Sequence, residues 1–287
     1  MQYNKPVTDL IKQCFSCRSY LKTPIEEEKR QQLEDFLSAT QTGPFSNRVR
    51  FKLVAATPQD SKAQKGLGTY GFIRNPRGFI ISAVEDTDKG LEDLGYAMER
   101  IVLFATDLGL GTCWLGGTFT KGRFAQKISA RDGELIPIVT SIGYAAGGSE
   151  NGLVRQFVGG AHRKPWDKLF FDRQFGAPIS RDAAGAYDVP LEMVRLGPSA
   201  SNKQPWRIVK DGSAWHFYLQ RTPGYRSGLG LRFVKGDDLQ RIDMGIAMSH
   251  FELTANELGL LGEWRVREPS IEKPDELAEY TASWVRE

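Results

Sequence analysis

The side chains best suited to bind a ligand are hydrogen-bond donors, and no obvious catalytic base stands near them in the sequence. Ser16 and Arg18 offer a hydroxyl group and a fixed charge, and Arg163 and Lys164 are adjacent cations after a long glycine-bearing segment. Two such cations can hold a phosphate through forked hydrogen bonds, although a solvated surface pair is the alternative. Gly116-Gly117 lacks side chains where a planar group could lie against backbone N–H groups. Together these donors suggest a bound cofactor that carries out the chemistry.

A second candidate binding segment, Gly197–Val209, reads Gly-Pro-Ser-Ala-Ser-Asn-Lys-Gln-Pro-Trp-Arg-Ile-Val. Pro198 fixes its own φ, and Ser199 and Asn202 can form hydrogen bonds with their own backbone or with a ligand. Pro205 then favours extended chain, and the residues after it alternate as a strand does. The segment predicts a hydrogen-bonding loop between a helix and a strand, with an ordinary connecting loop as the alternative.

Two short motifs suggest other chemistry, but their contexts do not support it. Gly66-Leu-Gly-Thr-Tyr-Gly71 matches the dinucleotide fingerprint, which needs a strand before it and a helix after it, whereas a strand is predicted to follow it. Cys14-x-x-Cys17 resembles a redox or zinc pair, yet it ends a predicted helix, and no second Cys/His pair stands at ligand spacing. We predict a connector and buried or half-buried thiols, and keep dithiol redox chemistry as an alternative.

The composition is that of a globular protein and excludes several classes of function. The chain has 287 residues, 40% of them apolar and 25% charged, enough for one large or two ordinary domains. The net charge of +3 without a basic block makes nucleic acid an unexpected partner. We expect no membrane span and no signal peptide, because no apolar run approaches ~18 residues and the start of the chain is polar. Three cysteines fit a reducing compartment, so we expect a cytoplasmic protein.

These candidate residues lie between elements that hydrophobic periodicity predicts. Helices are predicted over 8–15, 26–39, 91–108, 189–196 and 239–258, with a short one ending near 128 and a helix or turn over 274–280. Strands are predicted over 51–55, 78–84, 136–144, 206–209, 215–219, 264–267 and 281–286. The residues from 171 to 186 predict only a connector.

The order of helix, Gly-Pro loop, strands and long helix occurs twice along the chain. Three segments recur 150 to 154 residues apart: Gly43–Asn47 with Gly197–Asn202, Gly95–Met98 with Gly245–Met248, and Asp107–Leu110 with Glu257–Leu260. Because all three matches keep the same order, we predict two homologous α/β halves, residues 1–172 and 173–287. Such halves would form a pseudo-two-fold pair like a homodimer, with sites where they meet.

An ordered set of motifs carries a family resemblance over nearly the whole chain. The motifs are Ser16-x-Arg18, Leu108-Gly-Leu-Gly-Thr-Cys-Trp-Leu-Gly-Gly117, Ile142-Gly-Tyr144, Arg163-Lys-Pro165 and Pro198-Ser-Ala-Ser-Asn-Lys-Gln-Pro-Trp206. The chain resembles the flavin-dependent nitroreductase family, and its fused layout looks most like the putative TM nitroreductase branch. The resemblance implies an α+β fold of mixed sheets packed with helices. It also implies FMN sites that lie, in the family, across a dimer interface.

The resemblance assigns nine residues to the FMN site: Ser16, Arg18, Gly116, Gly117, Arg163, Lys164, Pro198, Ser199 and Asn202. The first two match positions beside the flavin's phosphate, ribityl chain and N1/O2 edge, and the glycines match backbone near N5. The basic pair matches residues near the phosphate. The last three match the loop that a partner subunit lays against the ring, and here the second half would be that partner.

The sequence departs from the family pattern in ways that bear on the site. Cys14 and Phe15 stand where basic residues are usual, and Ala200 stands where a second serine is common. The mirror site would use Gly43–Asn47, which is shortened, and Gly262-Glu-Trp264, which has no paired glycines. We therefore predict one FMN per chain, in a protein that can work as a monomer because its halves mimic the family dimer.

The resemblance implies an oxidoreductase that takes hydride from NAD(P)H onto flavin N5 and passes electrons to a small-molecule acceptor such as a nitroaromatic or a quinone. Three alternatives stay open. The chain could catalyse a different flavin reaction on the same fold, or bind flavin with little turnover, as the residues at 14 and 15 allow. Dithiol chemistry through Cys14 and Cys17 is the third alternative.

Overall fold

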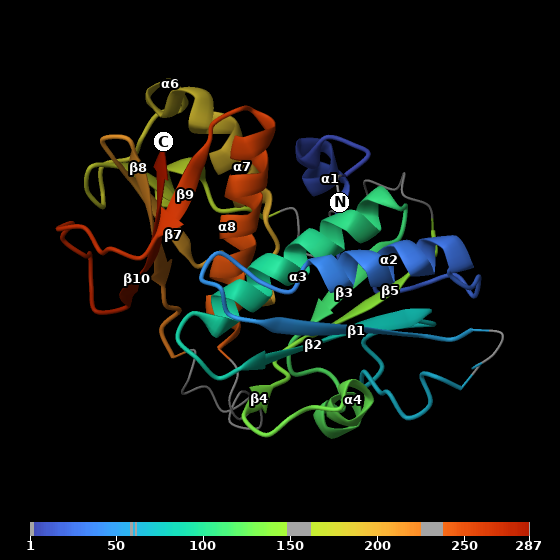
Figure 1. Ribbon diagram of the computed structural model, residues 1–287. Coiled ribbons are helices and arrows are strands. Elements are labelled where there is room, and N and C mark those ends of the chain that lie inside the picture. Colours follow the sequence, from blue (N-terminus) through green and yellow to red (C-terminus); the bar gives the residue numbers. More distant parts are fainter. Residues whose placement is uncertain (1–2, 58–59, 61, 148–161, 225–237, 287) are drawn as a thin grey trace.

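Two mainly antiparallel sheets with helices between and around them make up the computed structural model (Figure 1). It describes residues 3–57, 60, 62–147, 162–224 and 238–286. Sheet 1 has the strand order β1-β2-β5-β3, with β4 paired to β2: β1 Val49–Ala55, β2 Gly78–Glu85, β3 Gly111–Leu115, β4 Glu134–Leu135 and β5 Val139–Gly143. Sheet 2 has the order β6-β7-β8-β10-β9: β6 Phe170–Asp172, β7 Trp206–Asp211, β8 Ala214–Gln220, β9 Gly262–Arg265 and β10 Ala278–Arg286. In sheet 2 only the edge pair β6–β7 is parallel.

The two sheets have the same connectivity. In sheet 1 the helix α3, Gly90–Asp107, joins β2 to β3, and in sheet 2 the helix α8, Leu239–Glu257, joins β8 to β9. These two helices pack against each other at the centre of the molecule, with α3 beside sheet 1 and α8 beside sheet 2 (Figure 1). Both are buried on most of their surface, which explains why apolar residues recur around them beyond a single stripe.

Polar pairs also join α3 to α8. The guanidinium of Arg241 donates to both carboxylate oxygens of Glu92, at 2.9 and 2.7 Å. Farther along, the His250 ring Nε2 lies 2.8 Å from Glu99 Oε1, and both side chains are almost fully buried. The two helices are thus held by specific partners as well as by packing.

The other α-helices that the structure describes pack around the two central helices, against sheet 1 or against one another. They are α1 Val7–Gln13, α2 Glu27–Ala39, α4 Lys121–Ile128, α6 Arg181–Ala184 and α7 Asp188–Leu196. In α2, Leu33, Phe36 and Leu37 are buried, and the Phe36 ring stacks on Phe104 of α3 with centroids 4.1 Å apart. Thr8 of α1 donates its hydroxyl to a carboxylate oxygen of Glu257 at 2.9 Å, so α1 is fixed to the end of α8.

Several predicted elements differ from the structure. The predicted helix or turn at 274–280 is wrong in its second part, because β10 begins at Ala278. The strand predicted from 136 begins at Val139, and β3, which begins with a glycine, was not predicted as a strand. The connector at 171–186 contains part of β6 and α6. β6 also lies before the proposed boundary at residue 172 yet pairs with sheet 2, so the two-half division stays a prediction.

Within the described part of the chain, none of the helices combines the length and hydropathy needed to cross a membrane. The same residues contain no group of three or more His, Cys, Asp or Glu side chains placed to hold a metal ion.

Candidate functional site

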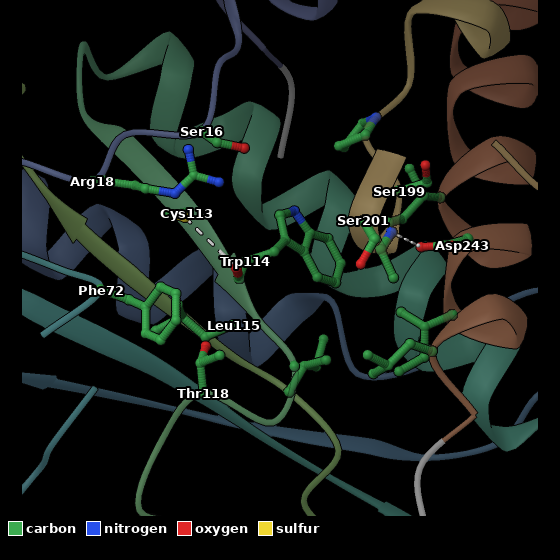
Figure 2. A pocket seen from close by; sticks show the side chains of 17 residues that line it. Ser16, Arg18, Phe72, Cys113, Trp114, Leu115, Thr118, Ser199, Ser201 and Asp243 are labelled. Carbon is green, nitrogen blue, oxygen red and sulfur yellow. Dashed lines mark hydrogen bonds between the residues drawn. The ribbon is translucent and has the colours of Figure 1, made fainter. Parts of the chain in front are cut away.

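A cavity of about 310 Å³ lies where sheet 1 meets the elements of sheet 2 (Figure 2). Its first wall consists of residues of the segment after α1, of β3 and of nearby loops: Ser16, Arg18, Phe72, Cys113, Trp114, Leu115, Gly116, Thr118 and Ile138. Its second wall consists of the loop after α7 and the first turns of α8: Pro198, Ser199, Ala200, Ser201, Leu239, Ile242, Asp243 and Ile246. Arg18 and Pro198, about 180 residues apart in the sequence, thus line opposite walls of one cavity.

Backbone hydrogen bonds fix the segment that carries Ser16 and Arg18. The Cys17 N–H donates to the Thr112 carbonyl at 2.7 Å, next to the bridge between Ser16 and Thr112. The Arg18 carbonyl accepts from the Arg74 N–H at 2.8 Å. The segment therefore runs beside β3 as a short extra strand, and the side chains of Ser16 and Arg18 point toward the cavity (Figure 2).

The end of β3 brings an aromatic side chain and a glycine to the cavity. The indole Nε1 of Trp114 is buried and has no hydrogen-bond partner among the described residues. A Cβ on Gly116 would lie 2.7 Å from Leu239 Cδ1, so a larger residue here would require the Leu239 side chain at the start of α8 to shift. Gly117 has φ +88°, where a glycine is favoured, but it does not line the cavity.

The loop between α7 and β7 forms the facing wall and has an unusual backbone. Ser201, Asn202 and Gln204 all have positive φ, of 51°, 53° and 47°. Such conformations cost free energy in residues other than glycine and persist where the surroundings fix them. Here the Ser199 hydroxyl accepts from the Gln204 N–H at 2.9 Å, and Asp243 Oδ1 accepts from the Ala200 N–H at 2.9 Å.

Arg163 and Lys164 hold this loop through hydrogen bonds. Arg163 donates to Asn202 Oδ1 at 2.9 Å and to the Leu196 carbonyl at 2.7 Å. The Lys164 N–H donates to Gln204 Oε1 at 2.7 Å, and its Nζ donates to the Gln204 carbonyl at 3.3 Å. Burial, followed by the charges of Arg207 and Lys203, lowers the pKa of Lys164 to about 8. Neither basic side chain lines the cavity, and their assignment to a flavin phosphate stays a prediction.

The comparisons with known proteins agree with this architecture. Residues 6–255 match the family model described as Putative TM nitroreductase. The chain belongs to this nitroreductase family. A comparison with curated proteins found no significant match.

Among solved structures, a putative nitroreductase from Thermotoga maritima is similar over 99% of this chain and 95% of its own, with a TM-score of 0.63 and 20% identity. An FMN-dependent nitroreductase from Clostridium difficile matches 48% of this chain and 87% of its own, with a TM-score of 0.39 and 19% identity. The first of these shows that the chain has the α+β nitroreductase fold.

Five of the nine residues that the family resemblance assigned to the site line one cavity: Ser16, Arg18, Gly116, Pro198 and Ser199. The other four, Gly117, Arg163, Lys164 and Asn202, are not among the residues that line it. The cavity is also lined by residues that we did not predict from the sequence, above all Trp114, Phe72 and Asp243. Trp114 stood within a quoted motif, and Asp243 stands two residues before a glycine of the repeated Gly-x-Ala-Met segment, so both had a signal in the sequence.

Burial lowers the reactivity of two of the cysteines. No disulfide joins Cys14 to Cys17, and burial raises the pKa of the Cys17 thiol, which donates to the Ser19 carbonyl at 3.2 Å. Burial also raises the pKa of Cys113, which lines the cavity, to about 11, although Arg18 opposes this shift. Because the thiolate is the reactive form, the thiols of Cys17 and Cys113 are poor nucleophiles at neutral pH.

Proposed function

We propose that this protein is an FMN-dependent oxidoreductase that takes electrons from NAD(P)H and passes them to a small aromatic acceptor. The observation that carries the proposal is the position of Arg18 and Ser16 opposite the Pro198–Ser201 loop across one cavity of a nitroreductase fold. Its volume of about 310 Å³ is at the lower end of the range of roughly 300–1,000 Å³ that ligand pockets occupy. A partly open cavity of this size can hold the planar part of a flavin.

The donor set of the cavity fits the flavin ring. Arg18 offers a permanent charge, Ser16 and Ser199 offer hydroxyl groups, and the buried Trp114 N–H has no partner in the described part of the protein. A buried donor without a partner is costly, and a ligand carbonyl or ring nitrogen would satisfy it. A bound FMN would supply two-electron transfer at its N5. Arg18 would bind the N1/O2 edge and favour the reduced form by Coulomb attraction to its negative charge.

A further observation supports a planar aromatic acceptor. Phe72 lines the cavity, yet 55% of its surface is exposed, and Tyr70 in the same loop is 68% exposed. Exposed aromatic side chains at the edge of a cavity offer stacking surfaces to flat ligands. Nitroaromatics and quinones are the acceptors that we would assay first, with NADH and NADPH as reductants.

We infer in addition that one chain contains two nitroreductase-like halves and completes its site without a second copy. The equal connectivity of the two sheets and the paired glycines of α3 and α8 support this inference. Because both walls of the cavity come from the same chain, we propose a monomer as the working unit.

The first test is the flavin content of the purified protein, measured by absorbance and by chromatography of the released cofactor. Anaerobic mixing with NADH or NADPH then discriminates between two functions. Bleaching of the flavin absorbance supports an oxidoreductase. A flavin that stays oxidised instead favours a binding protein with little turnover, a second candidate that the missing basic residues at Cys14 and Phe15 support. A protein that neither retains nor binds FMN would contradict both.

A further inference from the structure

Asp243 is a cavity residue whose carboxyl group is only half used by the protein. It projects from the second turn of α8 and is 2% exposed. Its Oδ1 accepts from the Ala200 N–H at 2.9 Å, as the dashed line in Figure 2 shows. Its Oδ2 is buried and has no partner among the residues that the structure describes. One oxygen therefore holds the Pro198–Ser201 loop while the other is left for a proton or a ligand.

Asp93 provides a comparison within the same chain. It stands 150 residues earlier, at the corresponding turn of α3, and also holds a Gly-Pro loop. Both of its oxygens are used: Oδ1 accepts from the Phe45 N–H at 3.0 Å, and Oδ2 accepts from the backbone and side-chain N–H groups of Asn47 at 2.8 and 3.0 Å. Burial raises the pKa of Asp93 as well, but three donors oppose the shift there, whereas a single donor opposes it at Asp243 and leaves the charge largely uncompensated.

The charged groups around Asp243 do not supply the missing compensation. Asp238, at the start of α8, has the same charge and disfavours ionisation. Arg241, on the same helix, is engaged with Glu92. Arg18 is on the other wall of the cavity. Burial raises the pKa of Asp243 well above its ordinary value, and the hydrogen bond from Ala200 only partly opposes this.

We propose that Asp243 is a neutral carboxylic acid in the resting protein and donates its proton to the acceptor that is reduced in the cavity. This proposal rests on the oxidoreductase function proposed above. For a quinone, one hydride equivalent from the NAD(P)H-reduced flavin and one proton from Asp243 give the hydroquinone. The O–H bond of Asp243 breaks, its electron pair stays on the carboxylate, and water returns a proton afterwards. Arg18 across the cavity would stabilise the transient negative charge of the carboxylate by Coulomb attraction.

The first experiment needs no cofactor. Infrared spectra of the flavin-free protein labelled with ¹³C-aspartate are compared for the wild type, Asp243→Asn and Asp93→Asn at neutral pH. We expect the carbonyl band of a protonated aspartic acid in the wild type, its loss in Asp243→Asn and its retention in Asp93→Asn. The absence of a band that depends on Asp243 would overturn the proposal.

The second experiment separates proton donation from positioning. Flavin-loaded, pre-reduced protein is mixed anaerobically with a quinone, which needs protons, or with ferricyanide, which accepts electrons without them. The amide in Asp243→Asn keeps an acceptor for the Ala200 N–H and a hydrogen-bond donor but no transferable proton. General acid catalysis contributes about 10²–10⁴-fold, so we expect the quinone rate to fall by about 100-fold and the ferricyanide rate to be unchanged.

Asp93→Asn is the matched control and should change neither rate. Equal loss of both rates in Asp243→Asn, or loss of neither, would contradict proton donation. If the wild type binds no flavin, the proposed function fails, and the infrared band alone then decides whether Asp243 is neutral.

Discussion

Gly95 and Gly245 lie at the crossing of α3 and α8, where each faces the backbone of the other helix. A Cβ on Gly95 would overlap the Ile242 carbonyl oxygen, and a Cβ on Gly245 would overlap the Glu92 carbonyl oxygen. Each glycine thus meets the residue three positions before its counterpart. This reciprocal contact is what a two-fold axis between the helices would produce, and it lets the two sheets approach from either side.

The first prediction is that Gly95→Ala and Gly245→Ala each destabilise the protein. Overpacking typically costs about 1–3 kcal/mol, and here the obstacle is backbone, which cannot rotate away as a side chain can. Gly122→Ala in α4 is the control, because its Cβ would meet nothing within 4 Å. That variant should be neutral or stabilising, since alanine favours helix by about 1 kcal/mol over glycine. Urea unfolding measures all three, and equal stabilities would contradict the close crossing.

The second prediction concerns Glu99 and His250, which are buried between the same helices. His250 Nδ1 lies 2.9 Å from the Met193 carbonyl, so Nδ1 carries a proton and Nε2 faces the Glu99 carboxyl group. Removing one partner leaves the other buried without its hydrogen bond. We expect His250→Ala to cost about 3 kcal/mol or more. Glu99→Gln should cost less, because the amide can donate to a neutral imidazole. A larger loss in Glu99→Gln than in His250→Ala, measured by denaturant unfolding, would contradict this order.

The sequence predicted most helices and strands because their burial follows a simple period. The 3.6-residue pattern from Leu91 to Leu108 became α3, and the β-branched run after Gly78 became the fully covered strand β2. β3 was not predicted because it is short and stands between glycines, which indicate a loop, although Thr112 and Trp114 favour a strand. The strands and loops around it bury it in the folded protein. The local hydrophobic pattern carries no information on which distant strands and loops pack around a segment.

The candidate site was predictable only in part for the same reason. Motifs identified Ser16, Arg18 and the Pro198 loop, and the structure brings them to one cavity. No pattern could tell that Arg163 and Lys164 bind the loop and do not line the cavity, because that depends on their contacts with Asn202 and Gln204. Asp243 was missed because its importance depends on an oxygen that tertiary packing leaves without a partner.

The third prediction is a pH dependence of stability that comes from Lys164. Burial lowers its pKa in the folded protein from 10.5 to about 8, so the unfolded chain binds more protons between these values. Stability therefore rises with pH across this window, and the penalty is fully present below pH 8. The unfolding free energy of the wild type should rise relative to that of Lys164→Met between pH 8 and 10. The exposed Lys22→Met, whose charge does not act on Lys164, controls for the loss of a positive charge, and a flat difference for Lys164→Met would contradict the lowered pKa.

The fourth prediction is that Arg18→Ala weakens FMN binding and slows flavin reduction. Loss of a charged hydrogen bond costs about 1.5–3 kcal/mol, so affinity should fall by about tenfold or more. Arg18→Lys keeps the positive charge but loses the forked hydrogen bonds of a guanidinium, so its FMN affinity should lie between those of the wild type and Arg18→Ala. Fluorescence titration with FMN and stopped-flow reduction by NAD(P)H measure both effects. The exposed Arg131→Ala is the control. Equal FMN affinities and equal reduction rates for Arg18→Ala and Arg131→Ala would show that Arg18 does not bind the flavin.

The fifth prediction is one FMN per chain, even though the two sheets share their connectivity. The loop Gly43–Asn47 is shorter than its counterpart, and its N–H groups are already bound to Asp93. A polar cavity of about 330 Å³ does lie near the start of α3, but Glu92, Arg241, Arg221 and Glu279 line it and are joined in ion pairs. An aromatic ring placed there would have to desolvate these charges without replacing their partners.

Released flavin divided by protein concentration, together with native mass spectrometry, should therefore give a ratio near one. Arg18→Ala provides the sharper check, because a single site predicts that the ratio falls toward zero. If a second flavin bound in the polar cavity, the ratio in the wild type would be near two, and Arg18→Ala would leave about half of the flavin in place. Such a result would mean that the ion pairs of Arg221 and Arg241 open to admit a ligand.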